Sequence, residues 1–136
     1  MNQPTNTSDI VDRLKLASNG LQYMSESDYP FEVFQWVGQE PNTAETLIKR
    51  TGHTPDTLVE VVQLDEFFRN ATQEQDWHND EEKETVKRYR QLVETLKTNL
   101  SDIQVFRLGT VEIDVYIIGQ TPSGELTGLS TKVVET

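Results

Sequence analysis

The sequence predicts a single α+β domain, built as a three-layer α-β-α sandwich around a mixed or antiparallel sheet. Segments with helical spacing of apolar residues are interspersed along the 136-residue chain with segments of strand-like alternation, and no linker or internal repeat divides them. Residues 31–37 (FEVFQWV) are apolar on both faces of an extended chain. This pattern is typical of a central strand that is covered by helices on both sides.

The chain is expected to begin with a flexible tail, residues 1–7, so that the folded domain spans residues 8–136. Ser8 is a suitable N-cap for a first helix, and the Asn-Gly pair at 19–20 is a typical helix end. The apolar residues between them recur at helical spacing: Ile10, Val11, Leu14 and Ala17. This stripe predicts a helix with one face on the core.

A loop is expected between this helix and the central strand, over residues 25–30 (SESDYP). Helical geometry is disfavoured for the residue before Pro30, so a helix cannot continue through this segment. The loop is therefore expected at the rim of the sheet, where it presents Glu26 and Asp28 from a rigid scaffold.

Three short elements are expected in the middle of the chain. Thr43 and Gly52 are the start and stop signals of a short helix. Residues 58–64 (LVEVVQL) have the composition of a partly buried strand. Asp65 is expected to cap one turn of helix directly after that strand.

Residues 80–100 form the longest predicted helix, with an acidic first turn that favourably opposes the helix dipole. Its apolar stripe consists of Val86, Tyr89, Val93, Leu96 and Leu100. Strands are predicted at 103–108, 111–118 and 126–133, the last two joined by a turn at 121–124. Alternation in the second of these strands predicts four inward side chains: Val111, Ile113, Val115 and Ile117.

The polar segment 70–79 contains one large apolar residue, Trp77. Two interpretations of this residue remain open from the sequence. Trp77 either folds back onto the core, as most large aromatic residues do, or it is an exposed anchor for a partner. The second interpretation is attractive because tryptophan is enriched among interface hot spots.

The balance of charge favours a basic partner. The chain has 23 acidic and 12 basic residues, a formal net charge of −11. Direct binding to nucleic acid or to anionic membranes is therefore not expected, because phosphate recognition draws on clustered lysine and arginine. Acidity can serve solubility alone. It can also accelerate encounters with a positively charged protein by long-range steering.

A cytoplasmic protein that is monomeric when free is expected. The chain has no cysteine, which excludes disulfides and thiolate sites and suits a reducing compartment. The first residues have neither a positive region nor an apolar region of a signal peptide, and no apolar run approaches the length that spans a bilayer.

Motifs for catalysis are scarce, and the chain is not expected to be an enzyme or to carry a cofactor. His53 and His78 are the two histidines, and neither has a recognisable spacing to a serine or an acid. The sequence contains no GxSxG elbow, no phosphate-binding glycine loop and no HExxH motif.

Two acidic groupings are candidates for chemical sites. Glu26 and Asp28 could form the acid pair of a hydrolase, although two such residues on an acidic loop are usually only solvated. Residues 76–80 (DWHND) resemble the start of a calcium-binding loop, but Glu81 stands where an EF-hand needs glycine.

The features that remain suit a protein that blocks a nuclease active site. They are a carboxylate loop, a tryptophan in a second loop and a chain that ends at Thr136. Nuclease sites are basic because they hold phosphates, and they often contain Mg²⁺, which prefers oxygen ligands. Carboxylate oxygens can therefore replace those of the scissile phosphate.

The chain also resembles a known family over nearly its whole length from Ile10 onward. The most specific matches are residues 24–34 (MSESDYPFEVF), 75–77 (QDW), 116–119 (YIIG) and 130–136 (STKVVET). The resemblance is to the nuclease A inhibitors of cyanobacteria, small cytosolic proteins that block a sugar-non-specific DNA/RNA endonuclease. It implies an α-β-α sandwich like that of plant pathogenesis-related protein 1.

The resemblance also implies roles for individual residues. Glu26 matches the glutamate that coordinates the catalytic Mg²⁺ of the nuclease. The resemblance therefore implies that Glu26 is a metal ligand only in the 1:1 complex with the nuclease. Trp77 matches the apolar anchor, and Asp76 matches an acidic residue of the interface. Thr136 matches the C-terminal threonine whose carboxylate meets basic groups of the nuclease.

Two positions depart from the family pattern, and one alternative function remains open. Asp28 stands where the family has a longer acid, and it remains a candidate interface residue. His78 stands where the family has an aromatic ring. The alternative is a module that binds a small ligand on the same sandwich, which predicts an internal pocket.

Overall fold

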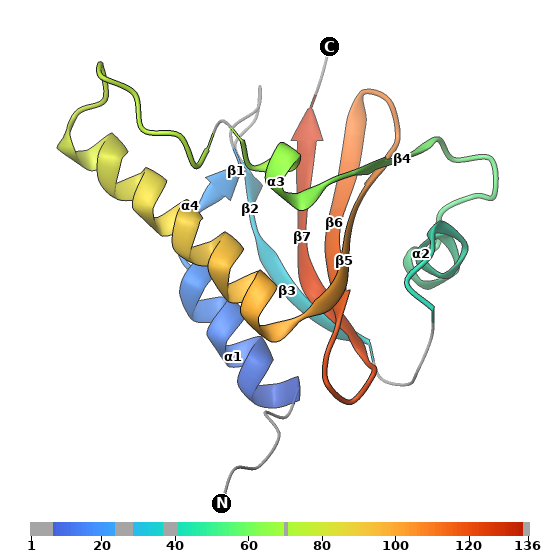
Figure 1. Ribbon diagram of the computed structural model, residues 1–136. Helices are drawn as coiled ribbons and strands as arrows, with labels where there is room; N and C mark the ends of the chain where they lie inside the picture. The colour runs from blue at the N-terminus through green and yellow to red at the C-terminus, as the bar shows by residue number, and fades with distance from the viewer. Residues whose placement is uncertain (1–6, 24–28, 37–40, 70, 135–136) are drawn as a thin grey trace, which may run out of the picture.

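The computed structural model describes residues 7–23, 29–36, 41–69 and 71–134. Within these ranges the chain forms helices and strands in an interspersed order (Figure 1). The elements are α1 (Thr7–Ser18), β1 (Gln22–Tyr23), β2 (Tyr29–Pro30), β3 (Glu32–Trp36), α2 (Ala44–Thr51), β4 (Val59–Val62), α3 (Leu64–Phe67), α4 (Asp80–Asn99), β5 (Ser101–Leu108), β6 (Glu112–Gln120) and β7 (Leu126–Val134).

One antiparallel sheet organises the molecule. Its five strands follow the order β3-β7-β6-β5-β4, and every neighbouring pair is antiparallel. β6 and β7 form the centre, paired from Glu112 opposite Val134 to Gln120 opposite Leu126. β1 and β2 form a separate two-stranded sheet. The sheet is thus antiparallel rather than mixed.

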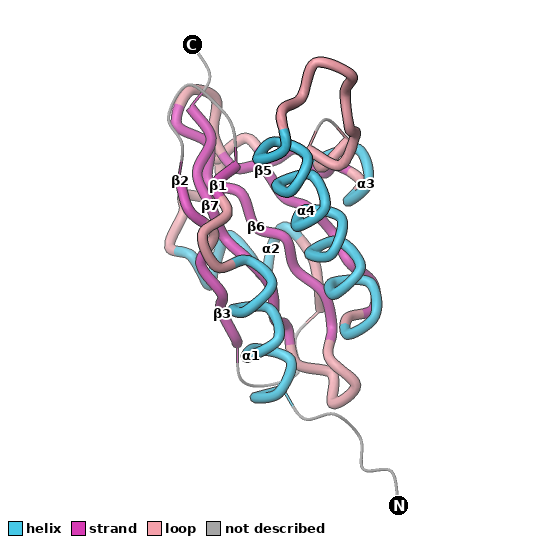
Figure 2. The backbone as a smooth tube through the Cα atoms, turned by 90° about the vertical axis from the view of Figure 1, so that its left-hand side faces the viewer, coloured by secondary structure: helices cyan, strands magenta, loops and turns pink. Residues whose placement is uncertain are grey.

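A layer of two helices covers one face of this sheet. α1 and α4 lie side by side on that face, as Figure 2 shows, with α3 at the edge beside β5. The core beneath them consists of apolar side chains from the helices and from alternate positions of the strands: Ile10, Leu14, Phe68, Tyr89, Leu92, Leu96, Val105, Val115, Ile117, Leu129 and Val133. Burial of these side chains is the main stabilising contribution to the fold.

The opposite face has a smaller apolar cluster under α2. Leu47 of α2 packs there with Phe106, Leu108, Ile118 and Leu126 of the sheet. Beyond the end of α2, the same face presents partly or fully exposed polar side chains: Glu32, Asp114, Tyr116, Ser130 and Lys132. With Tyr29, Pro30 and Thr131 these line a groove of about 240 Å³.

The predicted three-layer α-β-α sandwich of the pathogenesis-related-protein-1 type is therefore wrong. The molecule is an α+β protein with a single antiparallel sheet and a helical layer along one face. The eight-residue helix α2 covers only part of the other face. The physical reason is that the outward positions of β6 and β7 beyond α2 are polar, so they need no cover.

The strand expected at the centre of the sheet lies at its edge. β3 (Glu32–Trp36) pairs only with β7 among the described strands. Its two apolar faces are real, since Val33 packs on the main core while Phe34 and Trp36 pack beside Tyr116 on the outer face. An edge strand can therefore carry apolar residues on both faces when each face meets a separate cluster.

The boundaries of α2 follow the predicted signals, whereas Ser8, the predicted N-cap of the first helix, lies within α1, which begins at Thr7. Thr43 caps α2 by accepting from the Thr46 amide, and Gly52 ends it in the left-handed conformation. Asp65 does not act as a cap, because it lies within α3, which begins after Gln63. Val111 is 52% exposed and precedes β6, so the inward set begins at Ile113. No helix in the part of the chain that the structure describes is long and apolar enough to span a membrane.

Candidate binding site

Two of the predicted contact residues lie within the described chain and three outside it. Asp76 and Trp77 are described, whereas Glu26, Asp28 and Thr136 are not. The segments that flank these three residues are β1, β2 and the end of β7. Figure 1 shows these segments and the loop that follows α3 at the same end of the molecule. The structure therefore brings their attachment points to one end of the sheet.

The base of the segment that holds Glu26 and Asp28 is anchored. β1 and β2 pair on either side of it, with Tyr23 opposite Tyr29. The Thr131 hydroxyl lies 3.3 Å from the Tyr29 carbonyl oxygen and 3.1 Å from that of Pro30, so it donates from β7 to β2. Thr131 precedes Val134, the last described residue, by three positions, roughly 10 Å of extended chain. The base of the segment that holds Glu26 and Asp28 is thus close to the last described residues of the chain.

Trp77 is presented outward on a closed turn. Its side chain is 73% exposed. The turn runs from Gln75 to His78, and the His78 amide donates to the Gln75 carbonyl oxygen at 3.1 Å. Asp76 and Trp77 occupy the two central positions, and both are exposed. Of the two interpretations of Trp77, the exposed side chain agrees with the anchor and not with a core residue.

The loop around this turn is tied to its neighbours. Arg90 of α4 donates from Nε to the Thr72 carbonyl oxygen at 2.7 Å, and the Thr72 hydroxyl donates to the Phe68 carbonyl oxygen at 2.9 Å. Lys83 and Glu74 form an exposed ion pair at 3.9 Å. These contacts restrict the loop on the side of α4, which lowers the entropy lost when a partner binds the tryptophan.

The end of the loop is also the start of α4. Asn79 accepts from the Glu82 amide at 2.8 Å, and Glu82 accepts from the Asn79 amide at 3.3 Å, which completes a capping box. The first turn of α4 holds Asp80, Glu81 and Glu82. Trp77 is therefore an apolar side chain on a negatively charged surface. A partner with basic groups around an apolar contact suits this arrangement.

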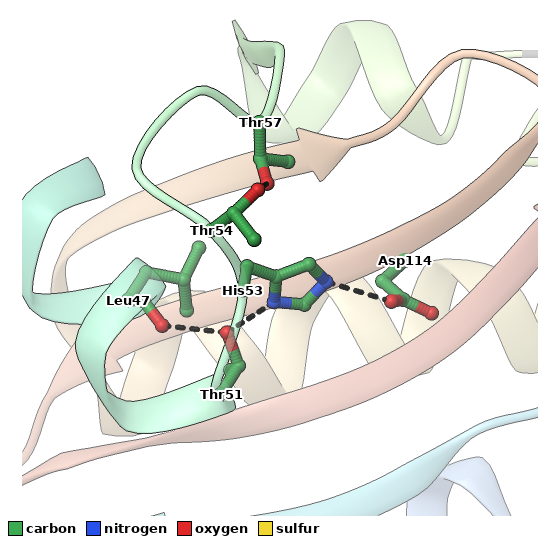
Figure 3. Close-up of polar contacts among 6 residues, drawn as sticks. All are labelled: Leu47, Thr51, His53, Thr54, Thr57 and Asp114. Carbon is green, nitrogen blue, oxygen red and sulfur yellow. Dashed lines mark hydrogen bonds and ion pairs between the residues drawn. The ribbon is translucent and has the colours of Figure 1, made fainter.

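A partly buried polar contact that the sequence did not indicate lies on the outer face of the sheet. His53, just after α2, contacts Asp114 of β6 through Nε2 at 2.9 Å, and the Thr51 hydroxyl contacts its Nδ1 (Figure 3). Thr51 also donates to the Leu47 carbonyl oxygen at 2.7 Å. His53 and Asp114 are 61 positions apart, so no local spacing could have identified the pair.

This cluster has the order hydroxyl, imidazole and carboxylate, but it is best described as a structural contact. The Thr51 hydroxyl proton is used at the Leu47 carbonyl oxygen, so the hydroxyl is held at the end of α2. Tyr116 lies beside the acid: burial, and then the charge of Asp114, raises the pKa of Tyr116 above its usual value. The contact joins the end of α2 to β6.

The groove between α1 and α4 and the acidic groups of the described residues do not form an enclosed site. A groove of about 680 Å³ between α1 and α4 is an open surface hollow, lined by Arg13, Leu16, Arg88 and neighbouring residues. Among the described residues, no group of three or more histidine, aspartate or glutamate side chains could hold a metal ion. The internal pocket expected for a small-ligand module is thus not formed by this groove.

The fold and the site together define an acidic α+β protein with features for binding another protein at one end of its sheet. The chain belongs to the nuclease A inhibitor-like family: the family model described as nuclease A inhibitor-like protein matches residues 8–136. A comparison with curated proteins gave no match. Membership of an inhibitor family supports a role as a nuclease inhibitor and is consistent with a protein that is not an enzyme.

Proposed function

We propose that this protein inhibits a Mg²⁺-dependent, sugar-non-specific DNA/RNA endonuclease by occupying its active site. The observation that carries the proposal is the position of Trp77, 73% exposed on a hydrogen-bonded turn. This turn lies at the same end of the molecule as the segments that lead to Glu26 and to Thr136 (Figure 1). Family membership gives the class of partner.

Glu26 supplies the central contact in this proposal. Its carboxylate enters the open coordination position of the partner's Mg²⁺, where a phosphate oxygen of the substrate would bind. Mg²⁺ is a hard cation that prefers oxygen ligands and is bound in such sites by carboxylates and phosphates. The pairing of β1 with β2 and the contact of Thr131 with β2 support the loop at its base. A supported loop loses less entropy on binding.

The other four contacts surround this one. Trp77 buries apolar area on the nuclease and acts as the hot spot. Asp76, Asp28 and the terminal carboxylate of Thr136 meet basic groups at the rim of the site. The rim mainly excludes water from the central contacts.

The proposed complex is non-covalent and contains one inhibitor and one nuclease. The inhibitor performs no chemistry, because its effect is to exclude nucleic acid from the metal. The net charge of −11 steers the encounter toward a basic cleft and disfavours direct contact with nucleic acid. The inhibitor acts in the cytoplasm, where it keeps a nuclease inactive.

The proposal is tested by titrating the protein into a sugar-non-specific nuclease that digests plasmid DNA in the presence of Mg²⁺. A linear loss of activity that ends at one inhibitor per nuclease is the expected result. The same titration with RNA as substrate is expected to give the same end point, because the metal is shared by both reactions. Undiminished digestion by the cognate nuclease at a large excess of inhibitor would remove the proposal.

A further inference from the structure

The turn that presents Trp77 is closed by two hydrogen bonds between the same two residues. The His78 amide donates to the Gln75 carbonyl oxygen at 3.1 Å. In the other direction, the Gln75 amide donates to Nδ1 of the His78 ring at 3.0 Å. The second bond needs a lone pair on Nδ1, so it forms only when the ring is neutral, with its proton on Nε2. Protonation of Nδ1 would place a donor against a donor.

The same ring also contacts Trp77. The centroids of the imidazole and indole rings are 4.3 Å apart, and their planes meet at 72°, an edge-to-face arrangement. His78 is partly buried, whereas the indole is 73% exposed. The histidine thus supports the tryptophan from one side, while the indole surface remains open to a partner.

We propose that His78 is a positioning residue for Trp77, and that protonation of its ring weakens the binding of the nuclease. The inference rests on the proposed function and adds its regulation by pH. Protonation of Nδ1 uses the lone pair that accepts from the Gln75 amide, so this hydrogen bond is lost when the ring takes up a proton. The backbone bond between the two residues remains, so the turn loosens rather than unfolds.

Most of the charged side chains around the turn are acidic. The charged side chains near His78 along the chain are Glu74, which pairs with Lys83, the exposed Asp76 and Asp80, the exposed Glu81, and Glu82 in the capping box. The Gln75 amide can donate only to the neutral ring. The charge of the ring and the shape of the turn are therefore coupled.

Two substitutions of His78 separate the role of the hydrogen-bond acceptor from the role of the aromatic ring. In His78→Asn, Oδ1 is separated from the backbone by the same number of bonds as Nδ1 of histidine. The variant therefore keeps an acceptor for the Gln75 amide, and this acceptor does not become protonated. It removes the ring from Trp77. His78→Phe keeps an aromatic ring but has no acceptor. Replacement of the other histidine, His53→Asn, serves as the control.

The first measurement uses the free inhibitor and needs no nuclease. In a two-dimensional NMR titration, the Gln75 amide resonance is expected to move with the same midpoint as the His78 ring. The titration should vanish in His78→Asn and His78→Phe and persist in His53→Asn. A Gln75 amide that does not respond to the protonation of His78 overturns the proposal.

The second measurement is the affinity for the nuclease between pH 5 and 8, expressed as a ratio between each variant and the wild-type chain. The ratio cancels changes in the nuclease itself. We expect wild-type affinity to fall about two- to tenfold relative to His78→Asn as the ring is protonated, the range for loss of one exposed hydrogen bond. A constant ratio overturns the inference.

The two measurements also distinguish this inference from the proposed function. If the wild-type chain inhibits no nuclease, the proposed function fails, and the NMR titration still decides whether His78 holds the turn. If the nuclease is inhibited but the Gln75 amide is insensitive to His78, the inhibitor role stands and the positioning role fails.

Discussion

At the scale of single residues, exposure assigns different roles to the two tryptophans. Trp36 is partly buried at the end of β3, with its ring centroid 4.8 Å from that of Phe34 and the Arg50 guanidinium 5.8 Å from the ring. It belongs to the packing around α2. Trp77 is 73% exposed and contacts His78 of its own turn. Its apolar surface is available to a partner.

Trp77→Ala is expected to weaken nuclease binding by about 2 kcal/mol or more, the threshold of a hot spot. The free energy of unfolding should change little, because the indole is mostly exposed already. Isothermal titration calorimetry and thermal unfolding give the two quantities. Leu16→Ala is the matched control, since Leu16 on α1 is 77% exposed and should affect neither. Lower thermal stability with unchanged affinity would contradict the anchor role of Trp77.

Glu26→Gln is expected to cost about 2 kcal/mol or more of binding free energy, the lower range for removal of one member of a buried charged pair. An amide is a poorer Mg²⁺ ligand than a carboxylate. The difference between glutamate and glutamine should disappear when Mg²⁺ is removed with a chelator. Asp28→Asn removes one charge from the same segment and should have a smaller effect in both conditions. Equal affinities of wild type and Glu26→Gln with Mg²⁺ present would show that Glu26 does not bind the metal.

At the scale of the elements, the contact of His53 with Asp114 joins the end of α2 to β6. We expect a coupling free energy of about 0.5–1.5 kcal/mol from a double-mutant cycle of His53→Ala and Asp114→Ala, the net range of one hydrogen bond. The two side chains are 20% and 35% exposed, which keeps the value low. Urea unfolding of the four proteins gives the measurement. Additive effects would mean that the contact contributes no stability.

Local signals predicted the elements well, and long-range packing accounts for the differences. Thr43 and Gly52 fixed the ends of α2 because capping depends on adjacent backbone groups. The position of β3 could not be derived in this way, since an edge strand with two apolar faces has the same local pattern as a central one. The contact between His53 and Asp114 depends on the pairing of distant strands, so it too has no local signal.

The same limit applies to the candidate site. The exposed Trp77 was one of two interpretations, and its exposure depends on whether the loop turns toward the core, which composition cannot decide. The reciprocal hydrogen bonds of Gln75 and His78 were not foreseen, because the turn residues are common polar types. The roles of Glu26, Asp28 and Thr136 rest on family resemblance and remain predictions.

At the scale of the whole molecule, the distribution of charge matters as much as its sum. The first turn of α4 contains three acidic residues, close to Trp77 along the chain. The start of β5, which holds Asp102, lies at the opposite end of the sheet (Figure 1). A field that steers a basic nuclease should therefore depend more on charges near Trp77 than on the net charge alone.

Two substitutions with the same change in net charge test this expectation. Glu81→Gln removes an exposed charge near Trp77, while Asp102→Asn removes an exposed charge at the far end and keeps a residue type that tolerates the positive φ of 50° found there. In stopped-flow association with the nuclease at low salt, Glu81→Gln is expected to slow binding roughly twofold and Asp102→Asn much less. The difference should shrink as salt shortens the Debye length. Equal slowing by both variants would show that only the net charge matters. No slowing by either variant would exclude electrostatic steering by the charges near Trp77.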